Sequence, residues 1–199
     1  MEPTKENIIK AHSIAKETGA DSTCKVLEAL YPDIDFTPQD NRPITERVKT
    51  FEDACAVLGE DHLYVQMFRD IYNKSEKAGA NVNIDVVAYL KLRVVCAALN
   101  EGWEPQHTED EVRYYPWHWL YTQDEINDMD CDERNDRCMM SVGEYETQYS
   151  GFACAHSYHA PSDANARLGS RLCLKSHDLA IYCGKQFIDL WADFKLIRR

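Results

Sequence analysis

The sequence predicts an α+β protein, in which a helical N-terminal half packs on a small antiparallel sheet closed by a C-terminal helix. Apolar residues recur at helical spacing between residues 44 and 102, short runs with strand character occupy 110–175, and helical spacing returns over 176–196. Helices followed by strands and a closing helix are typical of the α+β class. We expect residues 1–40 to be a variable helical attachment with a linker, and residues 41–199 to be one domain.

The N-terminal attachment reads as two short helices. They are expected over residues 4–18 and 21–31, with Asp21 or Ser22 as the N-cap of the second. The segment YPDIDFTPQDNRP, residues 31–43, contains three prolines and predicts a linker.

The helical half of the domain begins after this linker. Thr45 is expected to cap a helix that Gly59 ends, and a further helix is expected over about 62–74. The segment NIDVVAYLKLRVVCAALNEGWEP, from residue 83, then predicts a helix that ends at Asn100–Gly102. Its apolar residues are so numerous that we expect burial on more than one side.

The strand half has a different composition. EVRYYPWHWLYT is rich in aromatic residues, and Pro116 favours an edge or bent strand. DEINDMDCDERND carries seven acids and predicts a solvated loop or a helix start. It does not fit an EF-hand loop, because Glu133 and Met139 occupy the positions where that loop requires Gly and Glu, counted from Asp128. RCMMSVGEYE, GFACAHSY and RLGSRLCLKS read as strands, and Ser176 as the N-cap of the last helix.

Composition limits the classes of function. The formal net charge of −12 argues against direct binding of a nucleic-acid backbone, which needs clustered Lys and Arg. No apolar run approaches the roughly 18 residues of a membrane span, and residues 1–20 lack a secretory signal. We therefore expect a cytoplasmic protein with no membrane partner, whose eight cysteines are reduced thiols. No cofactor is expected, and a homo-oligomer is compatible with the composition.

Four segments carry a family resemblance: ITERVKTFEDAC, YLKLRVVCAALNEGWEP, YYPWHWLYT and GSRLCLKSHDLAIYCGKQFIDLWADF. They resemble an uncharacterised family of hypothetical proteins encoded by gut-bacterial phages and prophages. The resemblance covers most of the chain from about residue 44 onward, and its last segment is the most specific. It implies that the protein is encoded by a phage or prophage gene and is located in the host cell or associated with the virion. It implies no active site. It also implies that the block between YYPW and GSRLC is a variable presented surface.

The aromatic run YYPWHWLY is the best binding feature of the sequence, because Trp and Tyr offer rigid amphipathic contact area. The alternative is that Tyr115, Trp117 and Trp119 fill the core under the last helix. Arginines would be needed for a ligand that carries phosphate. The candidate contacts for a ligand or partner protein are Arg113, Trp117, Trp119, Tyr158, His159 and, in support, Arg171.

A zinc site is the weaker alternative. Cys131, Cys138, Cys154 and His156 are residue types that zinc prefers, and a strand over residues 150–158 would place Cys154 and His156 on one face. The spacing is looser than in common zinc motifs.

Nucleophilic catalysis would instead pair Cys154 or Cys173 with His118 or His177, and no local signature supports such a pair.

The sequence thus favours a non-enzymatic accessory protein that binds a ligand or a host partner through the loop-rich region 140–170 and the aromatic strand before it. A virion structural component is one alternative. A small-molecule sponge for a nucleotide signal, or a zinc-dependent protein acting against host defence, is another.

Overall fold

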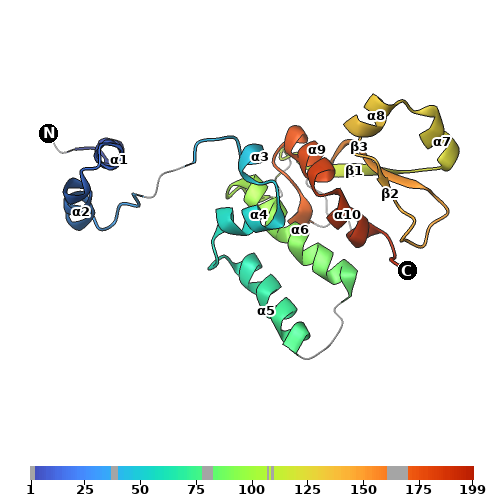
Figure 1. Ribbon diagram of the computed structural model, residues 1–199, viewed down its shortest axis with the longest axis horizontal. Helices are drawn as coiled ribbons and strands as arrows, with labels where there is room; N and C mark the ends of the chain where they lie inside the picture. The colour runs from blue at the N-terminus through green and yellow to red at the C-terminus, as the bar shows by residue number, and fades with distance from the viewer. Residues whose placement is uncertain (1–2, 37–39, 78–82, 107, 109, 161–169) are drawn as a thin grey trace. The chain divides into compact units, whose positions relative to one another are not determined.

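The computed structural model describes residues 3–36, 40–77, 83–106, 108, 110–160 and 170–199. The chain divides into two compact units, residues 1–42 and residues 43–199, and the larger unit has the predicted α+β fold (Figure 1). No helix among the described residues has both the length and the apolar character needed to cross a bilayer.

The smaller unit contains α1 (Lys5–Glu17) and α2 (Asp21–Leu30), which pack on each other. Thr4 caps α1 through its side chain, whereas α2 already begins at Asp21 and has Ala20 at its N-cap position. The predicted capping by Asp21 or Ser22 is therefore wrong. The helices are joined in part by a hydrogen bond of 2.8 Å between His12 Nε2 and Glu28 Oε1.

Four helices open the larger unit: α3 (Ile44–Arg47), α4 (Phe51–Leu58), α5 (Leu63–Lys77) and α6 (Ile84–Asn100). The single helix predicted from Thr45 to Gly59 is wrong, because Thr50 starts α4 with a reciprocal capping box to Asp53. Gly59 ends α4 as predicted, at a φ of 85° that favours glycine.

The core of the larger unit is centred on α6. Leu92, Val94, Val95, Cys96, Ala98 and Leu99 are all fully buried. The helix packs against α4, α5 and the C-terminal helices, which confirms the predicted burial on more than one side.

Within the described residues, the sheet has three antiparallel strands in the order β1–β3–β2: β1 (Arg113–Tyr121), β2 (Met140–Ser141) and β3 (Gly151–Ala160). The acidic segment between β1 and β2 forms α7 (Gln123–Asp128) and α8 (Cys131–Asp136), so the strands predicted over 110–175 are interrupted by helix. β1 lies at the edge of the sheet, as Pro116 predicted, and the register shifts between Trp117 and His118.

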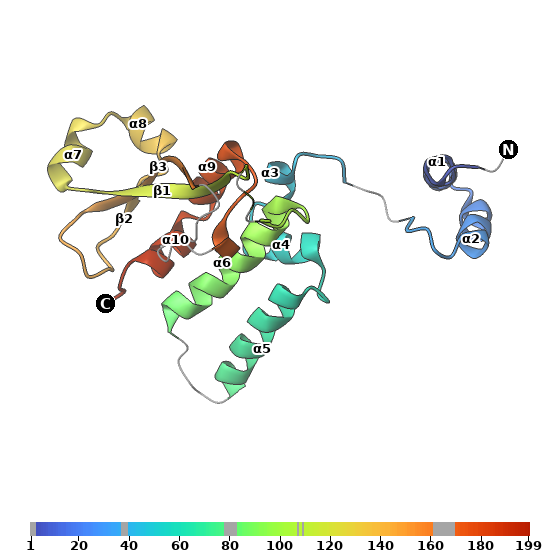
Figure 2. The same ribbon diagram turned by 180° about the vertical axis from the view of Figure 1, so that it is seen from behind.

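The C-terminal part contains η1 (Ser170–Leu172), α9 (His177–Gln186) and α10 (Ile188–Lys195). The strand predicted at RLGSRLCLKS is wrong in the described part, where η1 is followed by a single bridge between Leu174 and Tyr114. Ser176 caps α9 as predicted, but the closing helix is broken at Phe187. α9 packs on the sheet and α10 packs on α6, so the C-terminal helices lie between the sheet and the helices α4–α6 (Figure 2).

Candidate functional site

Trp117 and Trp119 lie on the face of the sheet opposite α9, with 37% and 50% of their surface exposed. Their ring centroids are 6.2 Å apart, and the imidazole of His156 stacks on Trp117 at 5.7 Å. We call these three residues the sheet-face aromatics. The alternative that this run fills the core holds for Tyr115, which is 3% exposed, and not for the two tryptophans.

Arg113, another predicted contact of the strand region, does not join this group. Arg113 is fully buried, and its Nε lies 3.9 Å from Glu111 Oε1. Its side chain is therefore an interior group and is closed to a ligand at the surface. The side chains of Tyr158 and His159 lie outside the described part of the structure, although the backbone of both belongs to β3.

The predicted zinc ligands are not brought together. Cys154 is fully buried and faces α9, whereas His156 is exposed on the opposite face. The cause is the register shift: His118 pairs with Cys154 and Trp117 with His156, so Ala155 is an extra residue that reverses the alternation of side chains. No cluster of three or more metal-ligating side chains occurs among the residues that the structure describes.

Cys154 and His118 are cross-strand neighbours, yet they do not form a nucleophile–base pair. His118 Nε2 donates to the Gly184 carbonyl at 3.3 Å, and His118 Nδ1 accepts from Lys195 Nζ at 2.9 Å. Burial raises the pKa of the Cys154 thiol to about 11, which keeps it protonated at neutral pH. Cys173, the other candidate nucleophile, is likewise buried with a pKa raised to about 11.

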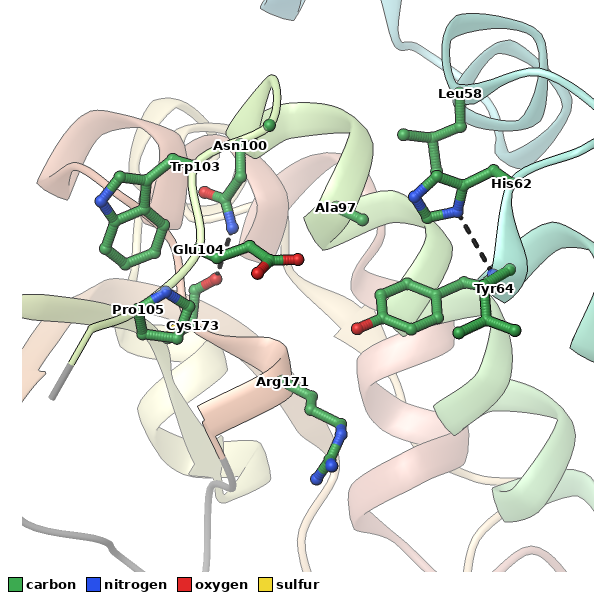
Figure 3. A pocket seen from close by; sticks show the side chains of 12 residues that line it. Leu58, His62, Tyr64, Ala97, Asn100, Trp103, Glu104, Pro105, Arg171 and Cys173 are labelled. Atoms are coloured by element: carbon green, nitrogen blue, oxygen red, sulfur yellow. Dashed lines mark hydrogen bonds between the residues drawn. The ribbon is translucent and has the colours of Figure 1, made fainter.

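Arg171 is the predicted contact that lines a pocket. The pocket has a volume of about 560 Å³ and lies between the junction of α4 and α5, the C-terminal end of α6 and the segment around η1 (Figure 3). Volumes of this size are typical of sites for small molecules.

Aromatic side chains form two sides of the pocket. Trp103 lies on one side, and Tyr64 and His62 lie on the other, with the Tyr64 hydroxyl directed toward the space between them (Figure 3). Leu58, Leu63 and Pro105 add apolar lining. Trp103 offers a ring surface on which a flat ligand can stack, and the Tyr64 hydroxyl offers a hydrogen bond from the opposite side.

The side that carries Trp103 is fixed by the end of α6. Glu101 adopts the left-handed conformation with a φ of 49°, and Gly102 follows with a φ of 83°, so the chain turns sharply before Trp103. Trp103 then packs against buried Tyr115 and Cys173. The buried Asn100 amide donates to the Cys173 carbonyl at 2.9 Å and accepts from the Lys175 amide at 3.0 Å. These two hydrogen bonds hold the end of α6, and with it Trp103, against the segment after η1.

The opposite side is fixed by the start of α5. His62 Nδ1 accepts from the Tyr64 amide at 3.2 Å, so the neutral imidazole carries its proton on Nε2. The Arg93 guanidinium lies 4.1 Å from the centre of the Tyr64 ring, a cation–π contact that holds the ring in place.

Two side chains of opposite charge stand in the pocket without pairing. The Glu104 carboxylate lies in the middle of the view, between Asn100 and Tyr64, and the Arg171 guanidinium extends away from it (Figure 3). Both residues are exposed, and within the described ranges neither forms an ion pair or hydrogen bond. Unpaired charges at the edge of an aromatic pocket are groups available to a ligand.

Sequence reasoning found Arg171 and missed Trp103, Tyr64 and Glu104. Trp103 had a local signal, since a large aromatic residue directly follows the predicted helix end at Asn100–Gly102. Tyr64 and Glu104 had none, because only tertiary packing brings residues 58–64, 97–105 and 171–173 together.

Comparison with protein families, with curated proteins and with solved structures gives no match for this chain. A function therefore has to be inferred from the chemistry of its own residues. Within the part of the chain that the structure describes, the aromatic pocket and the sheet-face aromatics both offer such chemistry.

Proposed function

We propose that the protein is a non-enzymatic, phage-encoded accessory protein that binds a small ligand with a flat ring in the pocket between Trp103 and Tyr64. The supporting observation is a volume of about 560 Å³ with aromatic side chains on opposite sides and two unpaired charges within it. The resemblance to phage-encoded proteins supplies the biological context. Binding without reaction fits the site, because the nearest thiol, Cys173, is buried with a pKa of about 11.

Native mass spectrometry tests this proposal. The full chain is purified from bacterial cells, and its native mass is compared with its denatured mass. We expect an excess of a few hundred daltons that is lost in Trp103→Ala, because the substitution removes one aromatic wall. Trp119→Ala is the matched control, since Trp119 is an equally large aromatic residue on the sheet face. No excess, or an excess that survives Trp103→Ala, contradicts the proposal.

A second candidate function is favoured by the sheet-face aromatics. Two tryptophans that are 37% and 50% exposed, with a histidine stacked on one of them, resemble the anchors of protein interfaces. Under this proposal Trp117 and Trp119 bind a host protein. Part of the predicted region 140–170, residues 161–169, lies outside the described residues.

The two candidate functions separate by mutation. A Trp117→Ser, Trp119→Ser double variant should lose a co-purifying host protein and keep any small ligand. Trp103→Ala should do the reverse. A partner that is retained by the double variant contradicts the second candidate.

A further inference from the structure

We infer that the ligand of this pocket is a guanine nucleotide, a ring with two adjacent N–H donors on one edge and an anionic group at the other end. The inference rests on the proposed function, and it identifies the ligand class from the two unpaired charges. Glu104 and Arg171 lie in one pocket without meeting each other, so one ligand can satisfy both only if it carries complementary groups at separate places.

Glu104 sets the requirement at the ring. An ionised carboxylate accepts hydrogen bonds through both oxygens and donates none. Guanine presents N1–H and the N2 amino group side by side, so its edge matches the two oxygens with two parallel hydrogen bonds. Adenine presents an acceptor at N1, which would face a carboxylate oxygen. A carboxylate between aromatic walls therefore selects guanine over adenine.

Arg171 sets the requirement at the other end. Its guanidinium is an exposed planar fork with five donors, a geometry that suits phosphate oxygens. It extends away from the Glu104 carboxylate (Figure 3). The donor edge and the phosphate of a nucleotide also point away from each other, on either side of the base and sugar.

The aromatic walls complete the match. Trp103 and Tyr64 lie on opposite sides of the space: the Trp103 ring is a surface on which a base can stack, and the Tyr64 hydroxyl points into the space as a hydrogen-bonding group. An organic cation would also suit aromatic walls and a carboxylate. It would, however, bring a positive charge into a pocket that already contains the unpaired Arg171 guanidinium.

The net charge of −12 acts against an anionic ligand at long range. At physiological ionic strength this repulsion is screened beyond about 8 Å, whereas the contact with Arg171 is direct. We therefore expect weaker binding of the nucleotide at very low salt than at about 0.15 M salt.

The experiment is isothermal titration calorimetry of the full chain with guanosine monophosphate, adenosine monophosphate and guanosine. Guanosine monophosphate should bind at least about tenfold more tightly than adenosine monophosphate, the equivalent of one hydrogen bond of about 1.4 kcal/mol. Glu104→Gln replaces one acceptor oxygen by a donor and should remove this preference. Arg171→Gln should reduce the affinity for guanosine monophosphate to that of guanosine and leave guanosine itself unchanged.

The controls separate this inference from the proposed function. Gln123→Ala, on the exposed face of α7, should bind all three probes like the parent chain, and equal unfolding temperatures show that each variant is folded. Equal affinity for the two monophosphates, lost in Trp103→Ala, overturns the guanine assignment and leaves a ring-binding pocket. Binding of tetramethylammonium that depends on Glu104 also overturns it, in favour of a cation. If no probe binds and the purified chain carries no extra mass, the pocket function and the guanine assignment both fail.

Discussion

His118 lies between the carbonyl of Gly184 and the ammonium group of Lys195, and each partner fixes the role of one ring nitrogen. A carbonyl can only accept, so Nε2 carries the proton, and an ammonium can only donate, so Nδ1 carries the lone pair. The ring also stacks on Phe152 at 4.6 Å. Burial, and secondarily the charge of Lys195, lowers the pKa of His118 to about 3.

This pKa predicts a loss of stability in mild acid. The folded pKa of about 3 lies below the unfolded value of 6.5, so the unfolded chain binds the extra proton between these limits. The contribution of His118 is complete above pH 6.5 and declines as the pH falls toward 3. Between pH 7 and pH 5 the free energy of unfolding should fall by about 2 kcal/mol from this group alone.

Thermal unfolding followed by circular dichroism checks the prediction between pH 7.5 and pH 4. His118→Gln cannot take up this proton, so its unfolding temperature should decline less over the range than that of the parent chain. Carboxylates titrate in both proteins and cancel in the comparison. Parallel curves for the two proteins would show that the pKa of His118 is the same in the folded and unfolded chains, which contradicts the prediction.

At Gly184, α9 packs closely against the sheet. A Cβ atom at this position would lie 2.5 Å from Cys154 Sγ and 2.7 Å from Pro116 Cβ. Gly184→Ala should therefore destabilise the fold by about 1–3 kcal/mol through overpacking. Gly143→Ala is the control, because its Cβ would meet only the Ser141 hydroxyl at 3.9 Å. Urea denaturation of both variants measures the difference, and equal midpoints would contradict the close packing.

At the scale of elements, Asn100 joins the end of α6 to the segment that follows η1. Its side-chain amide donates a buried hydrogen bond to the Cys173 carbonyl and accepts a partly buried one from the Lys175 backbone amide. Asn100→Ala leaves both backbone groups without this partner and should cost about 1–3 kcal/mol of unfolding free energy. It should also weaken ligand binding, because the Trp103 wall is anchored at this point.

A surface amide provides the comparison for Asn100. Gln123 donates only to Asn127 on the exposed face of α7, so Gln123→Ala should change stability by less than about 0.5 kcal/mol. Chemical denaturation and calorimetric titration of the two variants check both effects. If Asn100→Ala keeps the parent affinity, the wall does not depend on this bridge.

Elements with a complete local signal could be predicted from the sequence. The periodicity of α6, the glycine that ends α4 and the Ser176 cap each depend on a few neighbouring residues. The start of α4 also has a complete local signal, because Thr50, unlike Thr45, is followed three residues later by an acid, Asp53, that completes a capping box.

Features that depend on pairing between distant segments could not be predicted. The bulge at Ala155 exists because β1 and β3 pair with a shift, and it separates Cys154 from His156. The segment around Arg171 has strand-like residues but only one bridge, at Leu174, because no further strand lies beside it in the described structure. The pocket combines residues from positions 58 to 173, and its walls face each other only after folding.

At the scale of the whole molecule, the aromatic pocket and its anchors belong entirely to the unit formed by residues 43–199. The large hydrophobic core of that unit begins at Ile44 and Val48 and ends at Ala192. The unit of residues 1–42 has its own small buried group, Ile8, His12, Ala15 and Cys24. Each unit thus has an interior of its own, which is the requirement for independent folding.

This organisation predicts that residues 43–199 fold and bind without the N-terminal unit. The unfolding temperature of the truncated chain should lie within about 3 °C of the full chain, which corresponds to about 1 kcal/mol at this size. Its calorimetric affinity for guanosine monophosphate should also be unchanged.

A chain that starts at residue 50 should be less stable, because it lacks two buried residues, Ile44 and Val48. It also loses the hydrogen bond of 2.7 Å that the Val48 carbonyl accepts from the Tyr182 hydroxyl. Burial of two such side chains stabilises by about 3–6 kcal/mol, so the shorter chain should unfold at a clearly lower temperature. If both truncations lower the unfolding temperature equally, residues 1–42 stabilise the larger unit. The two units would then be separate in structure but not independent in stability.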